Sequence, residues 1–257
     1  SVVLGGGTAV EDIEFSGNTG YAAGWFGSIY RTTNTGETWV REDVPASEGE
    51  YIYSFAVKSR DVAITAGAYG VVYGRNGSST WFARNPRRLG AASSLAWPTA
   101  QDGFATIASG YLLTTSDGGN NWIESKLIEG VYTPKVIFAD QNHGVIFTWS
   151  DTFYYTSTRG SNWQKRLLPT GSYGITNATF ATPLVGYAVG GAGLILKTVD
   201  GGLTWSKSTG PDGANLYDLH FFDANTGVIG SYWNGIHKTT DGGVTWVRKA
   251  AYTAISL

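Results

Sequence analysis

The chain has 257 residues, and its 18 basic and 20 acidic side chains give it a formal net charge of −2. This balance provides no electrostatic basis for binding nucleic acid or an anionic membrane surface. No run of 18 apolar residues occurs, so the sequence predicts no membrane-spanning helix, and the absence of cysteine excludes disulfides and thiolate chemistry.

Six tryptophans recur along the chain at intervals of 42, 41, 41, 42 and 41 residues. They are Trp39, Trp81, Trp122, Trp163, Trp205 and Trp246. A fixed period of about 40 residues indicates a repeat architecture, and four short strands per period are typical of a β-propeller blade. We therefore expect residues 1–257 to form a single all-β propeller domain.

Each repeat has room for four strands, and the fifth repeat shows their limits most clearly. Strands are expected at residues 175–180, 186–189, 194–198 and 204–208, separated by turns and without a helical period. The expected first strands of the repeats end, in chain order, at Phe15, Val57, Trp97, Phe138, Phe180 and Phe222. Residues 252–257 form a seventh candidate. We expect a closed six-bladed ring in which a terminal strand completes a blade begun at the other end; a partial seventh blade is the alternative.

A short turn precedes each tryptophan and carries a polar residue at a fixed place. The residues five positions before the tryptophans are Asn34, Asn76, Asp117, Thr158, Asp200 and Asp241. An Asp or Asn side chain accepts hydrogen bonds from main-chain N–H groups just ahead of it. The glycine found three positions before the tryptophan in five repeats supplies a positive φ. We interpret these turn residues and the six tryptophans as structural.

This constellation resembles the Asp-box, or BNR, repeat. The run Gly-Tyr-Ala-Val-Gly followed by Thr-Val-Asp-Gly-Gly-Leu-Thr-Trp, between Phe180 and Trp205, is more narrowly similar to the Ycf48-like family of photosystem II assembly factors. The resemblance covers about residues 8–250 and implies a propeller that serves as an assembly-type scaffold. Asp-boxes also occur in glycosidases and lectins, so the turns alone do not decide the function.

Aromatic side chains are expected at the tips of the hairpins between the second and third strands of the repeats. They are Trp25, Phe26, Tyr69, Tyr111, Trp149, Tyr232 and Trp233, whereas the fifth tip, residues 190–193, has none. Hairpin tips ordinarily favour Gly, Asn and Asp. Exposed rings suit a surface that binds protein or sugar, because they supply contact area at low entropic cost. Packing between neighbouring blades is the alternative explanation.

The connectors between repeats are expected on the same face as these tips, and they are uneven in charge. Arg84, Arg87 and Arg88 cluster after the second repeat, while acidic residues follow the first. Such a patchwork can orient a protein partner. A solvated surface is the alternative.

Together these features predict a non-catalytic scaffold that binds a protein partner through the connector face. A glycan-binding module of a cell or virion surface, which uses the aromatic rim, is the alternative. A glycoside hydrolase is disfavoured, because it needs two carboxylates across a cleft and no spacing here singles out a pair. His143, His220 and His237 show no metal-ligand spacing, so we expect neither a metal nor another cofactor.

Methionine is absent from the whole chain, including position 1. We interpret the sequence as a mature product or an excised domain, and a removed signal peptide would account for its start. The expected location is therefore extracytoplasmic, in a periplasm, in a lumen, or at a cell or virion surface.

Overall fold

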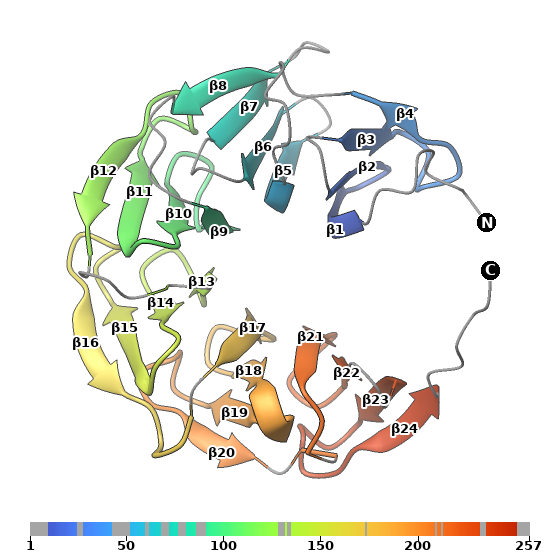
Figure 1. The fold of residues 1–257 in the computed structure, drawn as a ribbon, viewed down its shortest axis with the longest axis vertical. Coiled ribbons are helices and arrows are strands. Elements are labelled where there is room, and N and C mark those ends of the chain that lie inside the picture. The colour runs from blue at the N-terminus through green and yellow to red at the C-terminus, as the bar shows by residue number, and fades with distance from the viewer. Residues whose placement is uncertain are drawn as a thin grey trace. The chain divides into compact units, whose positions relative to one another are not determined.

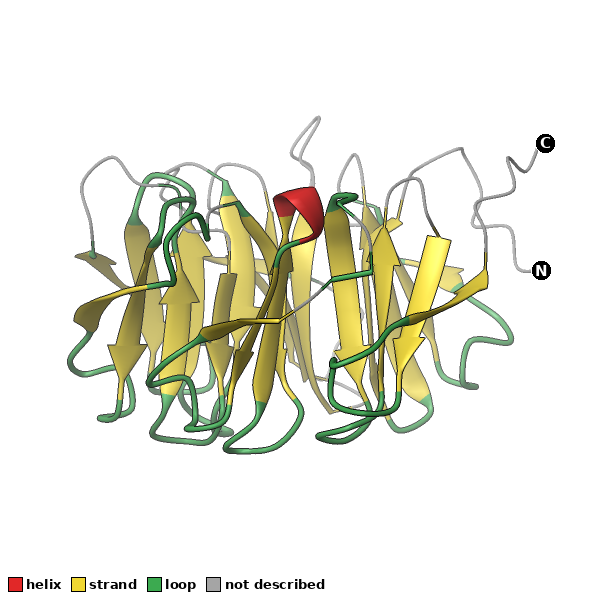
Figure 2. Cartoon of the chain, turned by 90° about the horizontal axis from the view of Figure 1, so that it is seen from below, coloured by secondary structure: helices red, strands yellow, loops and turns green. Residues whose placement is uncertain are grey.

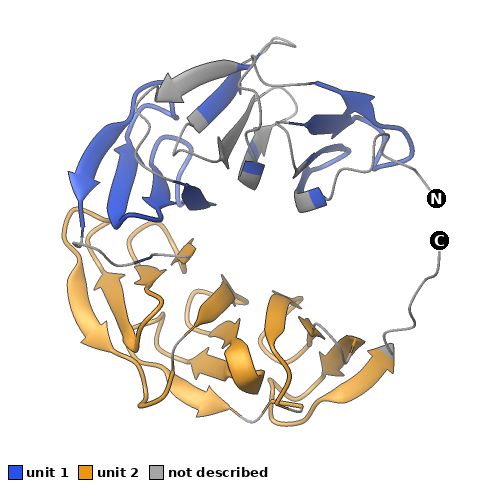
Figure 3. Ribbon diagram, in the orientation of Figure 1, with its two compact units in different colours: residues 1–133 blue, residues 134–257 orange. Residues whose placement is uncertain are grey.

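A computed structural model of the chain describes most of each repeat. The described residues are 10–24, 28–42, 52–59, 62–67, 72–76, 81–85, 91–127, 132, 135–172, 174–208, 210–211, 213–231 and 235–250. They form six four-stranded antiparallel sheets, each made of strands that are consecutive in the chain (Figures 1 and 2). The chain divides into two compact units, Ser1–Thr133 and Pro134–Leu257 (Figure 3).

The first unit contains three of these sheets. Sheet 1 consists of β1 (Val10–Ser16), β2 (Thr19–Gly24), β3 (Ile29–Thr32) and β4 (Val40–Arg41). Sheet 2 consists of β5 (Ile52–Ser59), β6 (Val62–Gly67), β7 (Val72–Asn76) and β8 (Phe82–Asn85). Sheet 3 consists of β9 (Ala92–Ala96), β10 (Gly103–Ile107), β11 (Tyr111–Thr115) and β12 (Ile123–Lys126). The first strands of neighbouring sheets, β1, β5 and β9, contact one another in turn.

The second unit repeats this plan. Sheet 4 consists of β13 (Lys135–Phe138), β14 (Gly144–Phe147), β15 (Thr152–Thr156) and β16 (Gln164–Leu167). Sheet 5 consists of β17 (Ile175–Phe180), β18 (Gly186–Gly190), β19 (Ile195–Thr198) and β20 (Ser206–Ser208), with the short 3-10 helix η3 (Gly191–Gly193) at a hairpin tip. Sheet 6 consists of β21 (Leu216–Phe221), β22 (Gly227–Ser231), β23 (Gly235–Thr239) and β24 (Val247–Ala250). Strand β17 contacts both β13 and β21.

The all-β class is confirmed, and the four strands expected in the fifth repeat lie within two residues of their expected limits, but the expectation of a closed six-bladed ring is wrong. Every sheet is completed by its own fourth strand, so the first sheet does not depend on a strand from the other end of the chain. Five sheets have a fourth strand of three or four residues, whereas β4 has two. The chain therefore has five fully formed sheets and one whose outer strand is reduced, in two units.

A packing rule explains the glycine that begins the second strand in most repeats. In sheet 5, a Cβ at Gly186 would lie 2.7 Å from the ring of Phe180, its partner across β17 and β18. The same ring packs against Trp205, with centroids 6.3 Å apart. Edge-to-face pairs repeat this arrangement at Phe15–Trp39, Trp97–Trp122, Phe138–Trp163 and Phe221–Trp246. The glycine is needed because the aromatic ring occupies the space of its side chain.

The predicted strand ends at Phe138 and Phe180 are confirmed, whereas β1, β5 and β9 end at Ser16, Ser59 and Ala96, and the register at Gly227 corrects the sixth end. Phe221, not Phe222, pairs with Gly227 and packs against Trp246, while Phe222 is 64% exposed. The two adjacent phenylalanines cannot be distinguished by hydrophobicity, so only the pairing shows which one faces the core.

Neighbouring sheets of the first unit are joined at Tyr21. Its hydroxyl accepts a hydrogen bond of 2.8 Å from Nη1 of Arg75, a guanidinium that is only 5% exposed. The same Nη1 lies 2.9 Å from Oε2 of Glu42, and Arg31 approaches that carboxylate at 3.8 Å. Burial is the main cause that raises the pKa of Tyr21.

Sheets 5 and 6 of the second unit are joined at Tyr187, which occupies the corresponding place in its repeat. Its ring stacks on Phe221 with centroids 3.6 Å apart, and its hydroxyl donates to the carbonyls of Ala224 and Gly242. Lys197 donates to the same Gly242 carbonyl at 2.8 Å. Burial raises the pKa of Tyr187 to about 12.

Among the residues that the structure describes, no helix has the length and apolar character needed to cross a membrane.

Candidate functional site

The described turns before the tryptophans are closed by hydrogen bonds of their own residues. In the sixth repeat, Oδ1 of Asp241 accepts the main-chain N–H groups of Val244 and Thr245 at 3.1 and 2.9 Å. The Thr239 hydroxyl accepts the N–H of Gly243, whose φ is +82°. Hydrogen bonds from Thr245, led by its hydroxyl, lower the pKa of Asp241 to about 2. The acceptor predicted at this position therefore closes the turn on itself rather than facing a ligand.

The other described turns use the same position in the same way. Asn34, Asp117 and Asp200 each accept the main-chain N–H four residues ahead at 2.9–3.0 Å, and Thr158 does so through its hydroxyl at 3.1 Å. Asn76 ends β7, and its side chain lies outside the described part of the structure. These contacts support the interpretation of the turn residues as structural.

The opposite ends of the sheets of the second unit carry a different arrangement, centred on the hairpin tip of sheet 4. The Thr148 hydroxyl accepts the N–H of Ser150 at 3.3 Å and donates to the carbonyl of Thr152 at 2.6 Å, which closes the tip. Trp149 lies between these residues and is 52% exposed. Its carbonyl accepts the N–H of Gly174 at 3.2 Å, so the tip is tied to the connector that leads into β17.

The next hairpin tip along the chain is η3, between β18 and β19. Ala192 in this helix has a φ of +53°, a left-handed conformation that side chains other than Gly, Asn and Asp rarely adopt. Its N–H donates to Oδ1 of Asn215 at 2.9 Å, and the N–H of Gly193 donates to the carbonyl of Ala214 at 2.8 Å. The connector before β21 thus fixes this strained tip.

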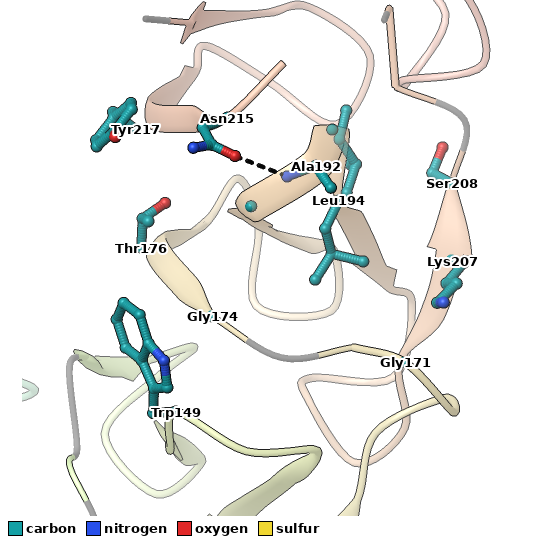
Figure 4. Close-up of a pocket in the computed structure, with 13 residues that line it drawn as sticks. Trp149, Gly171, Gly174, Thr176, Ala192, Leu194, Lys207, Ser208, Asn215 and Tyr217 are labelled. Atoms are coloured by element: carbon teal, nitrogen blue, oxygen red, sulfur yellow. Dashed lines mark hydrogen bonds between the residues drawn. The ribbon is translucent and has the colours of Figure 1, made fainter. Parts of the chain in front are cut away.

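A pocket of about 670 Å³ lies among these elements of the second unit (Figure 4). Its lining residues are Trp149, Gly171, Gly174, Thr176, Gly191, Ala192, Gly193, Leu194, Ile195, Lys207, Ser208, Asn215 and Tyr217. Figure 4 draws Trp149 and Tyr217 at one side of the pocket with Thr176 between them, and Lys207 and Ser208 at the other. The volume falls within the range of sites that bind small molecules or peptide side chains.

A recurring β-bulge brings two of these residues to the pocket. The register shifts between Ile175 and Asn177 in β17 and between Leu216 and Asp218 in β21. The extra residues are Thr176 and Tyr217. A bulge breaks the alternation of faces along a strand, and Tyr217 is accordingly 51% exposed beside the buried Leu216.

Of the two predicted aromatic tips that the structure describes, Trp149 and Tyr111, Trp149 lines this pocket. Tyr111, in the first unit, begins β11 and packs against the core of its own sheet, sheet 3, rather than against a neighbouring sheet. Trp25, Phe26, Tyr69, Tyr232, Trp233, Arg87 and Arg88 lie outside the described residues, and of Arg84, in β8, only the main chain is described.

Sequence reasoning missed Tyr217, Asn215, Lys207 and the glycine-rich fifth tip. The tip lacks aromatic residues, so it offered no sign of a binding surface, yet it forms a wall of the pocket. The signal available in the sequence was that two polar residues, Tyr217 and Asp218, follow Leu216. This departs from the alternation of apolar and polar residues along a strand. Among the described residues, no group of three His, Asp or Glu side chains is placed to hold a metal ion.

Comparisons with known proteins identify relatives of the chain. A family model described as "Photosynthesis system II assembly factor YCF48" matches residues 6–232. The photosystem II stability/assembly factor HCF136, chloroplastic, of Guillardia theta is 25% identical over 208 residues, which cover 79% of this chain and 49% of that protein. The photosystem II assembly lipoprotein Ycf48 of a Synechocystis species is 32% identical over 80 residues, or 30% of this chain and 23% of that protein. The match with the first of these relatives thus spans about half of the relative's length.

Solved structures show the fold. A structure described as YCF48 bound to D1 peptide is similar with a TM-score of 0.70 and 20% identity, covering 94% of this chain and 79% of the other. An ancestral GH74 enzyme is similar with a TM-score of 0.77 and 16% identity, covering 97% of this chain and 40% of the enzyme. Both are similar to this chain in fold, yet one is an assembly factor and the other an enzyme, so the fold does not identify the function.

Proposed function

Because the chain belongs to the Photosynthesis system II assembly factor YCF48 family, we propose that it is a scaffold that binds a protein partner through its connector face. The observation that carries this proposal is the pocket between the hairpin tips and connectors of the second unit, with the half-exposed Trp149 and Tyr217 at its side. Aromatic residues of this kind are enriched among the anchors of protein interfaces.

The family is one of assembly factors rather than enzymes, in line with the prediction of a non-catalytic protein. The described residues that line the pocket include no carboxylate, and Lys207 is the charged residue among them. Glycoside hydrolysis requires a pair of carboxyl groups, so this pocket suits binding better than that chemistry.

The partner and the location are part of the same proposal. A structure of a family member is described as bound to D1 peptide, and a related protein is named a lipoprotein. A lipid-anchored protein is commonly displayed outside the cytoplasm, which supports the expected extracytoplasmic location. We propose that a peptide segment of a photosystem protein occupies the pocket, and that Arg84, Arg87 and Arg88 of the first unit also contact the partner.

Fluorescence anisotropy with a labelled D1 peptide tests this proposal. We expect saturable binding that weakens about tenfold in the Trp149→Ala variant, because the truncation removes buried apolar area together with an aromatic contact of about 0.5–1.5 kcal/mol. Phe222→Ala is the matched control, since Phe222 is an exposed aromatic residue of the same unit that does not line the pocket.

The R84E/R87E/R88E variant tests the arginine cluster in the same assay, where we expect weaker binding. No binding of the D1 peptide to the folded chain would contradict the proposed partner. Binding that is equal in wild type and Trp149→Ala would remove the pocket from the interface.

A further inference from the structure

We infer that the pocket of the second unit binds a proline-containing, extended segment of the partner in the polyproline II conformation. The inference rests on the proposed function, because it specifies the peptide that the same pocket would take. Three features of the pocket lead to it: its aromatic side, its satisfied main-chain donors and its remaining side-chain donors.

The aromatic side of the pocket matches the ring of proline. Trp149 and Tyr217 come from different sheets, and each keeps about half of its surface exposed, at 52% and 51%. Gly171, Gly174 and the η3 tip carry little or no side chain, so the opposite surfaces are open. Grooves between aromatic rings are the usual receptors of polyproline II segments, whose shape is preformed at low entropic cost.

The main chain of the η3 tip cannot accept an added β-strand. The N–H groups of Gly191, Ala192 and Gly193 already donate to Gly174, Asn215 and Ala214, respectively. The N–H of Leu194 donates back to Gly191 at 3.1 Å. A strand needs a ladder of unpaired donors and acceptors, whereas a polyproline II segment needs none, since it has no main-chain hydrogen bonds of its own.

Two side chains of the pocket keep hydrogen-bond donors for a ligand. Asn215 uses Oδ1 to hold Ala192, and its amide Nδ2 has no acceptor among the described residues. The Lys207 ammonium donates one N–H to the carbonyl of Thr170, at 2.8 Å, and has two further N–H donors. The hydroxyls of Thr176 and Ser208 donate to main-chain carbonyls, so they add no donor to these two. A ligand that supplies carbonyl oxygens fits the donors of Asn215 and Lys207, and proline supplies a carbonyl oxygen without an N–H group that would itself need an acceptor.

Isothermal titration calorimetry with acetylated, amidated hexaproline tests the inference. An alternating Gly-Ser hexapeptide is the matched ligand, because it has equal length and a flexible backbone. We expect hexaproline to bind and the Gly-Ser peptide not to bind. Trp149→Ala and Tyr217→Ala should each weaken hexaproline binding about tenfold.

The Asn215→Asp variant isolates the donor argument. It keeps an oxygen that can accept the N–H of Ala192 but replaces the free amide with a second acceptor. We expect an affinity about fivefold lower than wild type, as for the loss of one hydrogen bond of about 1 kcal/mol. Phe222→Ala should bind as wild type, and thermal unfolding of every variant would verify that it is folded.

The outcomes separate this inference from the proposed function. Binding of the D1 peptide at Trp149 without any binding of hexaproline overturns the inference and leaves the proposed function intact. Binding of hexaproline without the D1 peptide supports the inference and overturns the proposed partner. Failure of both peptides overturns both proposals, and displacement of hexaproline by a neutral oligosaccharide would assign the pocket to glycans instead.

Discussion

Tyr21 and Tyr187 occupy the same place in their repeats, directly after the glycine of the second strand, but they join neighbouring sheets by different chemistry. Tyr21 in the first unit receives a hydrogen bond from the buried guanidinium of Arg75, which also faces the carboxylate of Glu42. Tyr187 in the second unit stacks on Phe221 and donates to main-chain carbonyls. The first contact depends on buried ionised groups, and the second on aromatic packing and neutral acceptors.

The difference shows that the repeat fixes the position of an inter-sheet contact without fixing its chemistry. A buried ion pair has to offset the desolvation of both charges, so removing one partner costs much more than the pair contributes. A stacked ring whose hydroxyl donates to carbonyls is itself uncharged, so it has no desolvation of an ionised group to offset. We therefore expect that replacing a charged residue at this contact destabilises the first unit more than the second.

The largest effect is expected for Glu42→Met, which removes the carboxylate that faces Arg75 while the guanidinium stays buried. We expect a loss of about 3–5 kcal/mol in the free energy of unfolding, as for other broken buried ion pairs. Chemical denaturation followed by tryptophan fluorescence measures it. The corresponding change in the second unit, Lys197→Met, should cost less, about 1.5–2 kcal/mol, because it removes one hydrogen bond to a carbonyl and a cation–π contact with Tyr187 but leaves no opposite charge behind.

The double variant E42M/R75M is the control for this prediction. It removes the charges of Glu42 and Arg75 and should recover part of the loss, since apolar replacement of an ion pair is often neutral, while Arg31 keeps its charge without the Glu42 carboxylate. Equal losses for Glu42→Met and Lys197→Met would contradict the proposed difference between the two contacts.

A smaller effect is expected for Gly186→Ala, which introduces a Cβ 2.7 Å from the ring of Phe180. Phe180 packs against the core of the second unit and cannot move freely, so we expect a cost of about 1–3 kcal/mol from overpacking. Gly20→Ala makes the same change next to Tyr21, but the ring that it meets, Phe15, is 45% exposed and can turn towards solvent. Differential scanning calorimetry should therefore show a larger loss for Gly186→Ala than for Gly20→Ala.

These pairs of glycine and aromatic ring show what the sequence could predict. The period, the strands and the hydrogen-bonded turns were predictable because each depends on residues close together in one repeat. The short outer strand of sheet 1, Val40–Arg41, was not predictable, because the spacing of the tryptophans does not change at that repeat. The periodicity also cannot show whether six repeats close into one ring.

The pocket was predicted only in part, and for a physical reason. Trp149 was recognisable because a tryptophan at a hairpin tip is unusual. Tyr217 and Asn215 reach the pocket from another sheet, and a bulge in β21 turns Tyr217 outward against the expected alternation. Such a bulge is a feature of strand pairing, which a single repeat does not encode in its pattern of apolar residues.

The smallest effect concerns the turn that supplies Gly242 to Tyr187 and Lys197. The pKa of Asp241 is lowered to about 2 in the folded chain, mainly by hydrogen bonds from Thr245. A carboxyl group whose pKa falls on folding stabilises the fold above its unfolded pKa of about 3.9, and this contribution is lost as the pH falls towards 2. Unfolding followed between pH 5 and pH 2 should therefore show a smaller slope for Asp241→Thr than for wild type.

Asp241→Thr is a matched change because Thr158 holds the same place in the fourth repeat, where its hydroxyl accepts the N–H of Asn162 at 3.1 Å. The variant should therefore keep its turn closed at neutral pH while losing the group that titrates. An unchanged acid slope would mean that Asp241 does not couple protonation to the contact between sheets 5 and 6. A reduced slope would show that the turn which presents the Gly242 carbonyl to Tyr187 and Lys197 draws stability from the charge of Asp241.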